Sequence, residues 1–148
     1  MGSLALPASG SVYLDTSIII YSVEAHAIYW PSLKGLWEQV KSGRIVLVSS
    51  ELAVLETLVA PLARNDAALI AAYQKLFLAS ELRVLPITRA ALHEGARLRA
   101  MLPPLRTPDA LHAATATLAG CAMFLTNDEG FRRVGGLPCT VLRDIIGS

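Results

Sequence analysis

The chain has 148 residues, of which 53% are hydrophobic and 17% charged, with 13 basic residues against 12 acidic ones. This length suits one domain with a sizeable core, and the composition excludes an intrinsically disordered chain. The near-neutral charge gives no overall sign of nucleic-acid binding, and no apolar run approaches the roughly 18 residues of a membrane span.

The segment "MGSLALPASG" at the start has neither a basic region nor a long apolar stretch. A secretory signal is therefore not expected, and the cytoplasm is the default location. We predict a flexible arm over residues 1–10 and a single domain over 11–148. Cys121 and Cys139 lack the spacing of a zinc site or a disulfide framework, so core packing is the better interpretation of both.

Short apolar runs predict the strands, and longer segments between them predict the helices. The predicted strands cover 11–14, 44–49, 82–87, 122–126 and 139–144. The predicted helices cover 17–25, 32–42, 51–64, 65–80, 89–102 and 106–120, with a loop or short helix at 128–135. The expected helix starts are Asp15 or Ser17, Pro31 in a first turn, Ser50, Asn65-Asp66, Thr88 and Thr107. Pro61 is expected to bend or end its helix.

Strands and helices alternate, and the strands are continuously apolar instead of alternating in polarity. This pattern is typical of a parallel sheet buried on both faces. We therefore predict an α/β fold, a three-layer α/β/α domain with a central, mostly parallel sheet. In such sheets, ligands bind at the carboxyl ends of the strands.

Four acidic residues fall near predicted strand ends and helix starts or within an apolar helix, namely Asp15, Glu56, Asp109 and Asp128. Each has a plain structural alternative: a helix cap for Asp15 and Asp128, a favourable helix dipole for Asp109, and a solvent-facing position for Glu56. The helix of Glu56 has few other polar positions to form an outer face. Glu51, in the first turn of the same helix, is explained by the helix dipole alone.

Taken together, these four carboxylates indicate a cation site. Clustered carboxylates cannot all stay ionised without a cation, because like charges raise each other's pKa. Oxygen ligands without cysteine or paired histidines favour Mg²⁺ or Mn²⁺ over zinc, and such a site suits phosphodiester hydrolysis. We expect Asp15, Asp109 and Asp128 to lie within reach of one cation, with Glu56 in the same pocket.

Four segments, "VYLDTSIII", "SSELAVLETL", "RTPDALHAATA" and "FLTNDEGF", resemble in order and separation the acidic motifs of the PIN-domain ribonucleases. The resemblance spans about residues 11–145 and is closest to the VapC toxins of toxin–antitoxin pairs. It implies a Mg²⁺- or Mn²⁺-dependent endoribonuclease whose metal is bound by Asp15, Glu56, Asp109 and Asp128. It also implies polar support from Thr16, Ser17, Thr126 and Asn127, a homodimer, and a small VapB-like antitoxin that covers the acidic groove.

The sequence says less about RNA contacts. Arg132 and Arg133 follow Asp128, and Arg106 precedes Asp109, so these are the candidates for phosphate binding, with a solvated surface as the alternative. His112 lies three residues after Asp109 on the same helix face. It is a candidate for contacting phosphate or holding a carboxylate, but ordinary packing is favoured.

Two other functions remain open at this stage. A non-catalytic PIN-fold module that binds RNA or a partner protein is one, although the intact acidic quartet counts against it. Phosphoryl transfer through an aspartyl phosphate is the other, but the haloacid-dehalogenase pattern needs a second Asp where Ser17 stands. A response-regulator receiver needs an acidic pair and a late lysine, and the chain has no lysine after Lys75.

Overall fold

The predicted strands assemble into one parallel sheet. The structure is a computed structural model that describes residues 4–146. Its strands are β1 (Gly10–Leu14), β2 (Ile45–Ser50), β3 (Arg83–Leu85), β4 (Met123–Thr126) and β5 (Cys139–Val141). Their spatial order is β3-β2-β1-β4-β5, and each neighbouring pair runs parallel. This confirms the predicted α/β class with a central parallel sheet.

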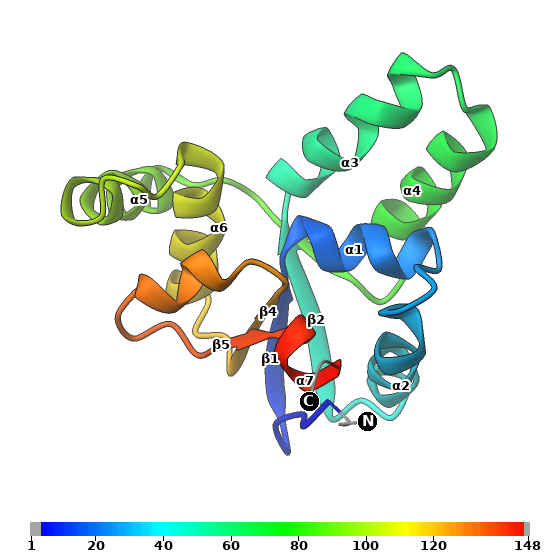
Figure 1. Cartoon of the computed structure of the whole chain (residues 1–148), viewed down its shortest axis with the longest axis horizontal. Coiled ribbons are helices and arrows are strands. Elements are labelled where there is room, and N and C mark those ends of the chain that lie inside the picture. The colour runs from blue at the N-terminus through cyan, green and yellow to red at the C-terminus, as the bar shows by residue number, and fades with distance from the viewer. Residues whose placement is uncertain (1–3, 147–148) are drawn as a thin grey trace.

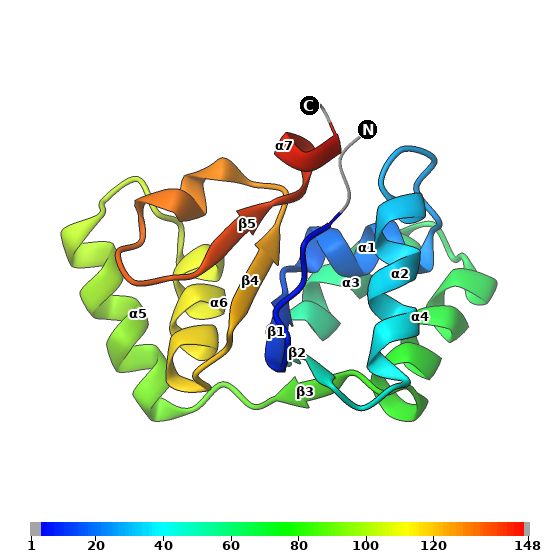
Figure 2. The ribbon, with the colours of Figure 1, turned by 90° about the horizontal axis from the view of Figure 1, so that it is seen from below.

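Helices cover both faces of the sheet, as the strand pattern predicted (Figures 1 and 2). Helices α1 to α4 lie on one side, and α5 and α6 lie on the other. The helices are α1 (Thr16–Val23), α2 (Trp30–Val40), α3 (Leu52–Ala63), α4 (Ala67–Ala79), α5 (Arg89–Met101), α6 (Thr107–Leu118), the 3₁₀ helix η1 (Glu129–Arg133) and α7 (Leu142–Ile146). None of the helices within residues 4–146 is long and apolar enough to cross a membrane.

The helix starts agree with the sequence in most places. Asp15, Asp66 and Thr88 each cap a helix through a side-chain oxygen that accepts a backbone N–H. Thr107 was the wrong choice for α6, because Arg106 holds the cap position and the Thr107 hydroxyl accepts from the Arg99 guanidinium at 3.0 Å.

Two further sequence expectations need correction. Pro61 does not end α3, which continues to Ala63, and a bend at Pro61 stays a prediction. The last predicted strand, 139–144, ends at Val141, where the chain turns directly into α7.

The core has two halves because successive residues of a buried strand point to opposite faces of the sheet. Leu14 packs with Leu33 and other apolar side chains beneath α1 to α4, whereas Tyr13 packs with Phe124 beneath α5 and α6. Cys121 is buried in the second half and Cys139 packs against it, in agreement with the core role expected for both.

The predicted N-terminal arm is only partly described. Leu4 and Leu6 are half-buried and pack against the core, while residues 1–3 lie outside the described residues. The flexibility of residues 1–10 therefore stays a prediction.

The order of the strands fixes where a site can form. From β1 the chain builds β2 and then β3 outward, and it then crosses to the other side of β1 to form β4 and β5. The direction of winding thus reverses between β1 and β4. In open parallel sheets, ligands bind at the carboxyl ends of the strands beside such a reversal.

Candidate active site

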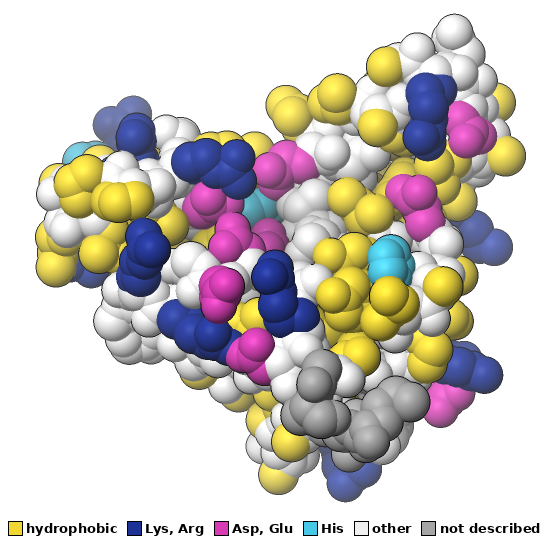
Figure 3. Space-filling view, in the orientation of Figure 1, with side chains coloured by type: hydrophobic (Ala, Val, Ile, Leu, Met, Phe, Trp, Pro, Cys, Tyr) yellow, Lys and Arg dark blue, Asp and Glu magenta, His cyan; other side chains and the backbone are white. Residues whose placement is uncertain are grey.

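The four candidate acids gather at the carboxyl edge of the sheet. Asp15 follows β1 directly and Asp128 lies two residues after β4, so both flank the reversal between these strands. Glu56 is contributed by α3, which follows β2, and Asp109 lies in the first turn of α6. Acidic side chains cluster near the centre of the face shown in Figure 3, with basic side chains beside them. The fold therefore brings the predicted residues to one rim of the molecule.

Asp15 is buried, and each of its carboxylate oxygens accepts one hydrogen bond. Its Oδ1 accepts the backbone N–H of Thr16 at 2.8 Å, and its Oδ2 accepts the hydroxyl of Thr126 at 2.6 Å. Only 8% of the residue is exposed. Burial raises the pKa of Asp15 above its ordinary value, and the charge of Asp109 adds to this, while His112 and the two hydrogen bonds act in the opposite direction. A nearby cation would relieve the cost of keeping this carboxylate ionised.

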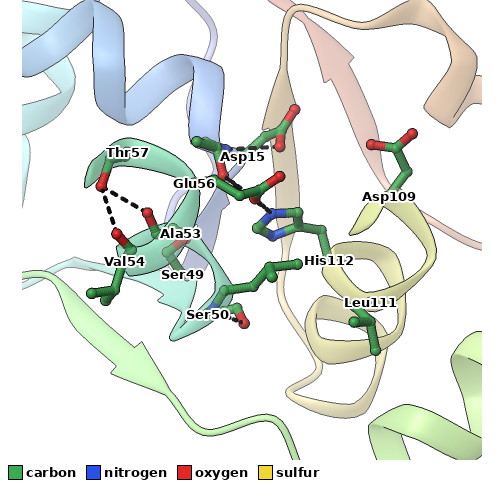
Figure 4. A network of polar contacts seen from close by, with 12 residues as sticks. Asp15, Ser49, Ser50, Ala53, Val54, Glu56, Thr57, Asp109, Leu111 and His112 are labelled. Carbon is green, nitrogen blue, oxygen red and sulfur yellow. Dashed lines mark hydrogen bonds and ion pairs between the residues drawn. The ribbon is translucent and has the colours of Figure 1, made fainter. Parts of the chain in front are cut away.

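Glu56 meets a buried imidazole. Its Oε1 accepts the hydroxyl of Thr16 at 2.7 Å and lies 2.6 Å from Nε2 of His112 (Figure 4). Burial would raise the pKa of Glu56, but hydrogen bonds from His112 and Thr16 outweigh it and lower the pKa. Glu56 is therefore ionised at neutral pH. Thr16 links two of the acids, because its backbone bonds Asp15 and its hydroxyl bonds Glu56.

Asp109 and Asp128 line a cleft of about 270 Å³ together with Arg106 and Arg133. Asp109 pairs with Arg106 at 3.2 Å, and Asp128 is exposed and caps η1 by accepting the N–H of Gly130 at 2.8 Å. The structural explanations therefore both hold: Asp109 lies in the first turn of α6, where the helix dipole favours it, and Asp128 caps η1. They do not exclude a further role, because a carboxylate has more acceptor positions than these single bonds use.

The remaining polar candidates divide between two environments. Thr126 contacts the acids, since its hydroxyl also accepts the N–H of Asp128 at 3.0 Å. The side chain of Asn127 instead bonds the Tyr21 hydroxyl and the backbone of Arg143, and so joins β4 to α1 and α7. Within residues 4–146, the buried hydroxyl of Ser17 has no hydrogen-bond partner.

The acids share one edge but do not converge. Among residues 4–146, no group of three Asp, Glu, His or Cys side chains is arranged to hold a metal ion. The expectation that three carboxylates lie within reach of one cation is therefore not met in this structure. Each acid is instead held by its own hydrogen bonds. The donor set nevertheless fits a hard divalent cation, because it is made of carboxylates and hydroxyls and includes the desolvated carboxylate of Asp15. Glu56 keeps one oxygen, Oε2, to which no described residue donates.

The three arginines predicted to bind RNA differ in exposure and in whether an acidic side chain already pairs with them. Arg133 is exposed on the cleft, and Arg106 is exposed there but pairs with Asp109. Arg132 is turned to Glu129 and Asp144, which already neutralise its charge. His112 is 1% exposed, so the structure favours its role as a partner of Glu56 over contact with phosphate.

The sequence profile of the PIN domain matches residues 12–137 of the chain. The chain belongs to the PIN-domain family. The match covers the β1 acid at its start and the η1 region at its end, so all four candidate acids lie inside it. The comparison with curated proteins gives no significant match.

Solved structures share this PIN fold at low sequence identity. A VapBC2 complex of Rickettsia felis bound to a promoter DNA fragment is 20% identical, with a TM-score of 0.69 over 88% of this chain and 98% of that one. The sarcin–ricin loop cleaving toxin VapC20 of Mycobacterium tuberculosis is also 20% identical, with a TM-score of 0.69 over 84% and 95% of the two chains. FitAcB of Neisseria gonorrhoeae is 18% identical, with a TM-score of 0.62 over 86% and 95%. At these identities the likeness concerns the fold.

Sequence reasoning missed two residues that shape this PIN-domain site. Tyr13 lies within β1 and places its hydroxyl 2.6 Å from Nδ1 of His112. Because Tyr13 stands in an apolar run, the sequence predicts only core packing for it. Arg143 donates to both the side-chain and the main-chain oxygen of Asn127, next to Asp128. The sequence gives no sign of this contact, because it predicts a strand over 139–144, whereas the turn into α7 is what brings Arg143 to Asn127.

Proposed function

We propose that this PIN-domain protein is a divalent-metal-dependent endoribonuclease, the toxin of a toxin–antitoxin pair. The observation that carries the proposal is that four carboxylates from separate elements lie on the carboxyl edge of the sheet, two of them flanking the reversal between β1 and β4. Helix capping explains Asp15 and Asp128 but not Glu56, which lies inside α3 and contacts His112 of α6. Family membership and the fold likeness to structures described as toxins support the same function.

Asp15, Glu56, Asp109 and Asp128 would hold Mg²⁺ or Mn²⁺ in this enzyme. When bound, the cation would neutralise the clustered carboxylates and polarise the scissile phosphodiester. The chain's own residues orient the acids: Thr126 and Thr16 fix Asp15, and Thr16 also fixes Glu56.

Substrate binding and proton transfer use the cleft beside the acids. Arg133 and Arg106 supply positive charge for RNA phosphates, where hydrogen bonds to phosphate position the strand without reading its sequence. Asp128 accepts the proton of the attacking water, because it is exposed on the cleft and pairs with no basic side chain among residues 4–146, whereas Asp109 is paired with Arg106.

The partners follow from the same proposal. A small VapB-like antitoxin would cover the acidic groove, and the protein would act in the cytoplasm as a homodimer. Exposed apolar side chains of α3 support a covered face: Leu55, Val59 and Leu62 are 62%, 59% and 56% exposed and lie on one side of the helix. Size-exclusion chromatography with light scattering tests the dimer, and a monomeric protein would contradict it.

Growth and cleavage assays test the enzyme directly. Expression without an antitoxin should arrest a bacterial host, and Asp15→Ala or Asp109→Ala should abolish the arrest. Glu51→Ala is the matched control, because Glu51 precedes the same helix as Glu56 but is exposed and makes no capping bond. The purified protein should cleave RNA only with divalent metal and leave 5′-phosphate and 3′-hydroxyl ends. Ends with a 2′,3′-cyclic phosphate would show attack by the ribose and refute the mechanism.

A non-catalytic PIN module is the second candidate, and the Arg106–Asp109 ion pair and the missing convergence of the acids favour it. Such a protein would bind RNA equally well with and without Mg²⁺ and leave it intact. Phosphoryl transfer through Asp15 has no support, because a buried carboxylate with both oxygens hydrogen-bonded is a poor nucleophile.

A further inference from the structure

His112 is a buried side chain whose polar partners come from three other elements. Its Nδ1 lies 2.6 Å from the hydroxyl of Tyr13 in β1, and its Nε2 lies 2.6 Å from Oε1 of Glu56 in α3 and 3.2 Å from the hydroxyl of Thr16 in α1. His112 itself lies on α6, one turn after Asp109. A histidine that merely filled the core would not need partners at this one rim.

The chemistry of Glu56 fixes the direction of its hydrogen bond with His112. An ionised carboxylate only accepts, so Nε2 must carry the proton that is shared with Glu56. The Tyr13 hydroxyl, which carries a proton and two lone pairs, bonds Nδ1 whether that nitrogen accepts or donates. Burial raises the pKa of Tyr13, so the phenol keeps this proton. The chain of bonds therefore runs from Tyr13 through His112 to Glu56, with each polar atom satisfied.

Tyr13 is a rigid start for this chain of bonds. It is fully buried, and its ring stacks on that of Phe124 with centroids 5.1 Å apart and planes 8° apart. The two residues face each other in the register of β1 and β4, so the sheet itself sets the position of the ring. His112 meets the edge of this ring at 5.8 Å and 73°.

Glu56 is the acid that most needs such a support. Its side chain is longer than those of the three aspartates and 27% exposed, and it comes from a helix with an exposed apolar face. An unsupported glutamate loses substantial rotamer entropy when it is fixed in one position. Both of its hydrogen bonds fall on Oε1, which leaves Oε2 for a ligand.

We propose that Tyr13 and His112 are positioning residues that hold Glu56 in its ligand-binding orientation at the carboxyl edge of the sheet. The proposal rests on the nuclease function above and assigns His112 no contact with RNA. It also explains why a tyrosine hydroxyl stands among the buried residues of β1.

Tyr13→Phe, His112→Gln and His112→Leu test this role. Tyr13→Phe removes one oxygen and keeps the stacked ring, while glutamine retains a donor for Glu56 and leucine retains none. Loss of a partner behind a metal ligand typically costs about 10- to 100-fold in affinity or activity, so we expect kcat to fall about tenfold in Tyr13→Phe with KM for RNA unchanged. His112→Gln should keep more activity than His112→Leu. Affinity for Mn²⁺ alone, measured by electron paramagnetic resonance without RNA, should weaken in the same order.

Tyr73→Phe is the control, because Tyr73 is equally buried and its hydroxyl donates to Glu24, which is not one of the four site acids. It should lower stability and leave kcat and Mn²⁺ affinity per folded molecule unchanged. If Tyr13→Phe behaves like Tyr73→Phe, the pair is structural and the inference is wrong while the nuclease function stands. A wild-type protein that neither binds Mn²⁺ nor cleaves RNA overturns both.

Discussion

The hydroxyl of Thr126 joins two of the site acids, so its removal gives a measurable loss of stability. Thr126 is fully buried, and its Oγ1 donates to Oδ2 of Asp15 at 2.6 Å and accepts the backbone N–H of Asp128 at 3.0 Å. Thr126→Val keeps the branched shape and removes both bonds. The carboxylate of Asp15 then stays buried with one donor fewer.

The magnitude follows from the two bonds. A hydrogen bond to a charged group contributes about 1.5–3 kcal/mol, and a neutral one about 0.5–1.5 kcal/mol. The exposed backbone of Asp128 can recover part of its bond from water, so we expect a loss of about 2–4 kcal/mol in the free energy of unfolding at pH 7 without metal. The loss should shrink in acid, where Asp15 is protonated and its bond to Thr126 becomes neutral.

Urea unfolding followed by circular dichroism measures this loss as a lower midpoint with an unchanged m-value. Thr115→Val is the matched control, because the buried Thr115 hydroxyl only donates back to the Leu111 carbonyl of its own helix at 2.7 Å. We expect that control to change stability by less than about 1 kcal/mol. Equal losses in the two variants would refute the argument that Thr126 stabilises a buried carboxylate.

Three other outcomes are expected. Millimolar Mg²⁺ or Mn²⁺ should raise the melting temperature of the wild type and raise that of Asp15→Asn less, because the cation relieves repulsion among the acids; an unresponsive wild type would contradict the metal site. Burial and the bond to Glu24 raise the pKa of Tyr73 in the folded protein. The protonated Tyr73 therefore stabilises the folded state at low pH, and this stabilisation is lost as pH rises above about 10, the pKa of tyrosine in the unfolded chain. Tyr73→Phe should flatten this alkaline loss in unfolding experiments, and parallel pH curves would show that Tyr73 is not its source. Arg133→Ala should weaken RNA binding and make the plot of log K against log salt concentration less steep by about 0.7. Arg132→Ala should have a smaller effect, because Arg132 is already paired with Glu129 and Asp144. Equal effects of the two variants in a filter-binding titration would contradict this ranking.

Much of the fold could be read from the sequence because its signals are local. Continuous apolar runs predicted buried parallel strands, and Asp15, Asp66 and Thr88 act at helix starts as expected. The boundaries that failed were those where a tertiary contact competes with local preference. The Thr107 hydroxyl is occupied by Arg99, and the segment after Val141 becomes a helix rather than continuing the strand.

The sequence by itself also predicted that Asp15, Asp109 and Asp128 share one rim, because the carboxyl ends of parallel strands lie on one edge and each of these acids follows a strand or starts a helix there. It did not determine how their side chains are held. Tyr13 and His112 are 99 residues apart, and a hydroxyl inside an apolar strand carries no local sign of its partner. Only the packing of α6 against the sheet brings the imidazole between Tyr13 and Glu56. Hydrogen bonds between side chains of distant elements depend on ångström-scale placement, which the three-dimensional fold alone provides.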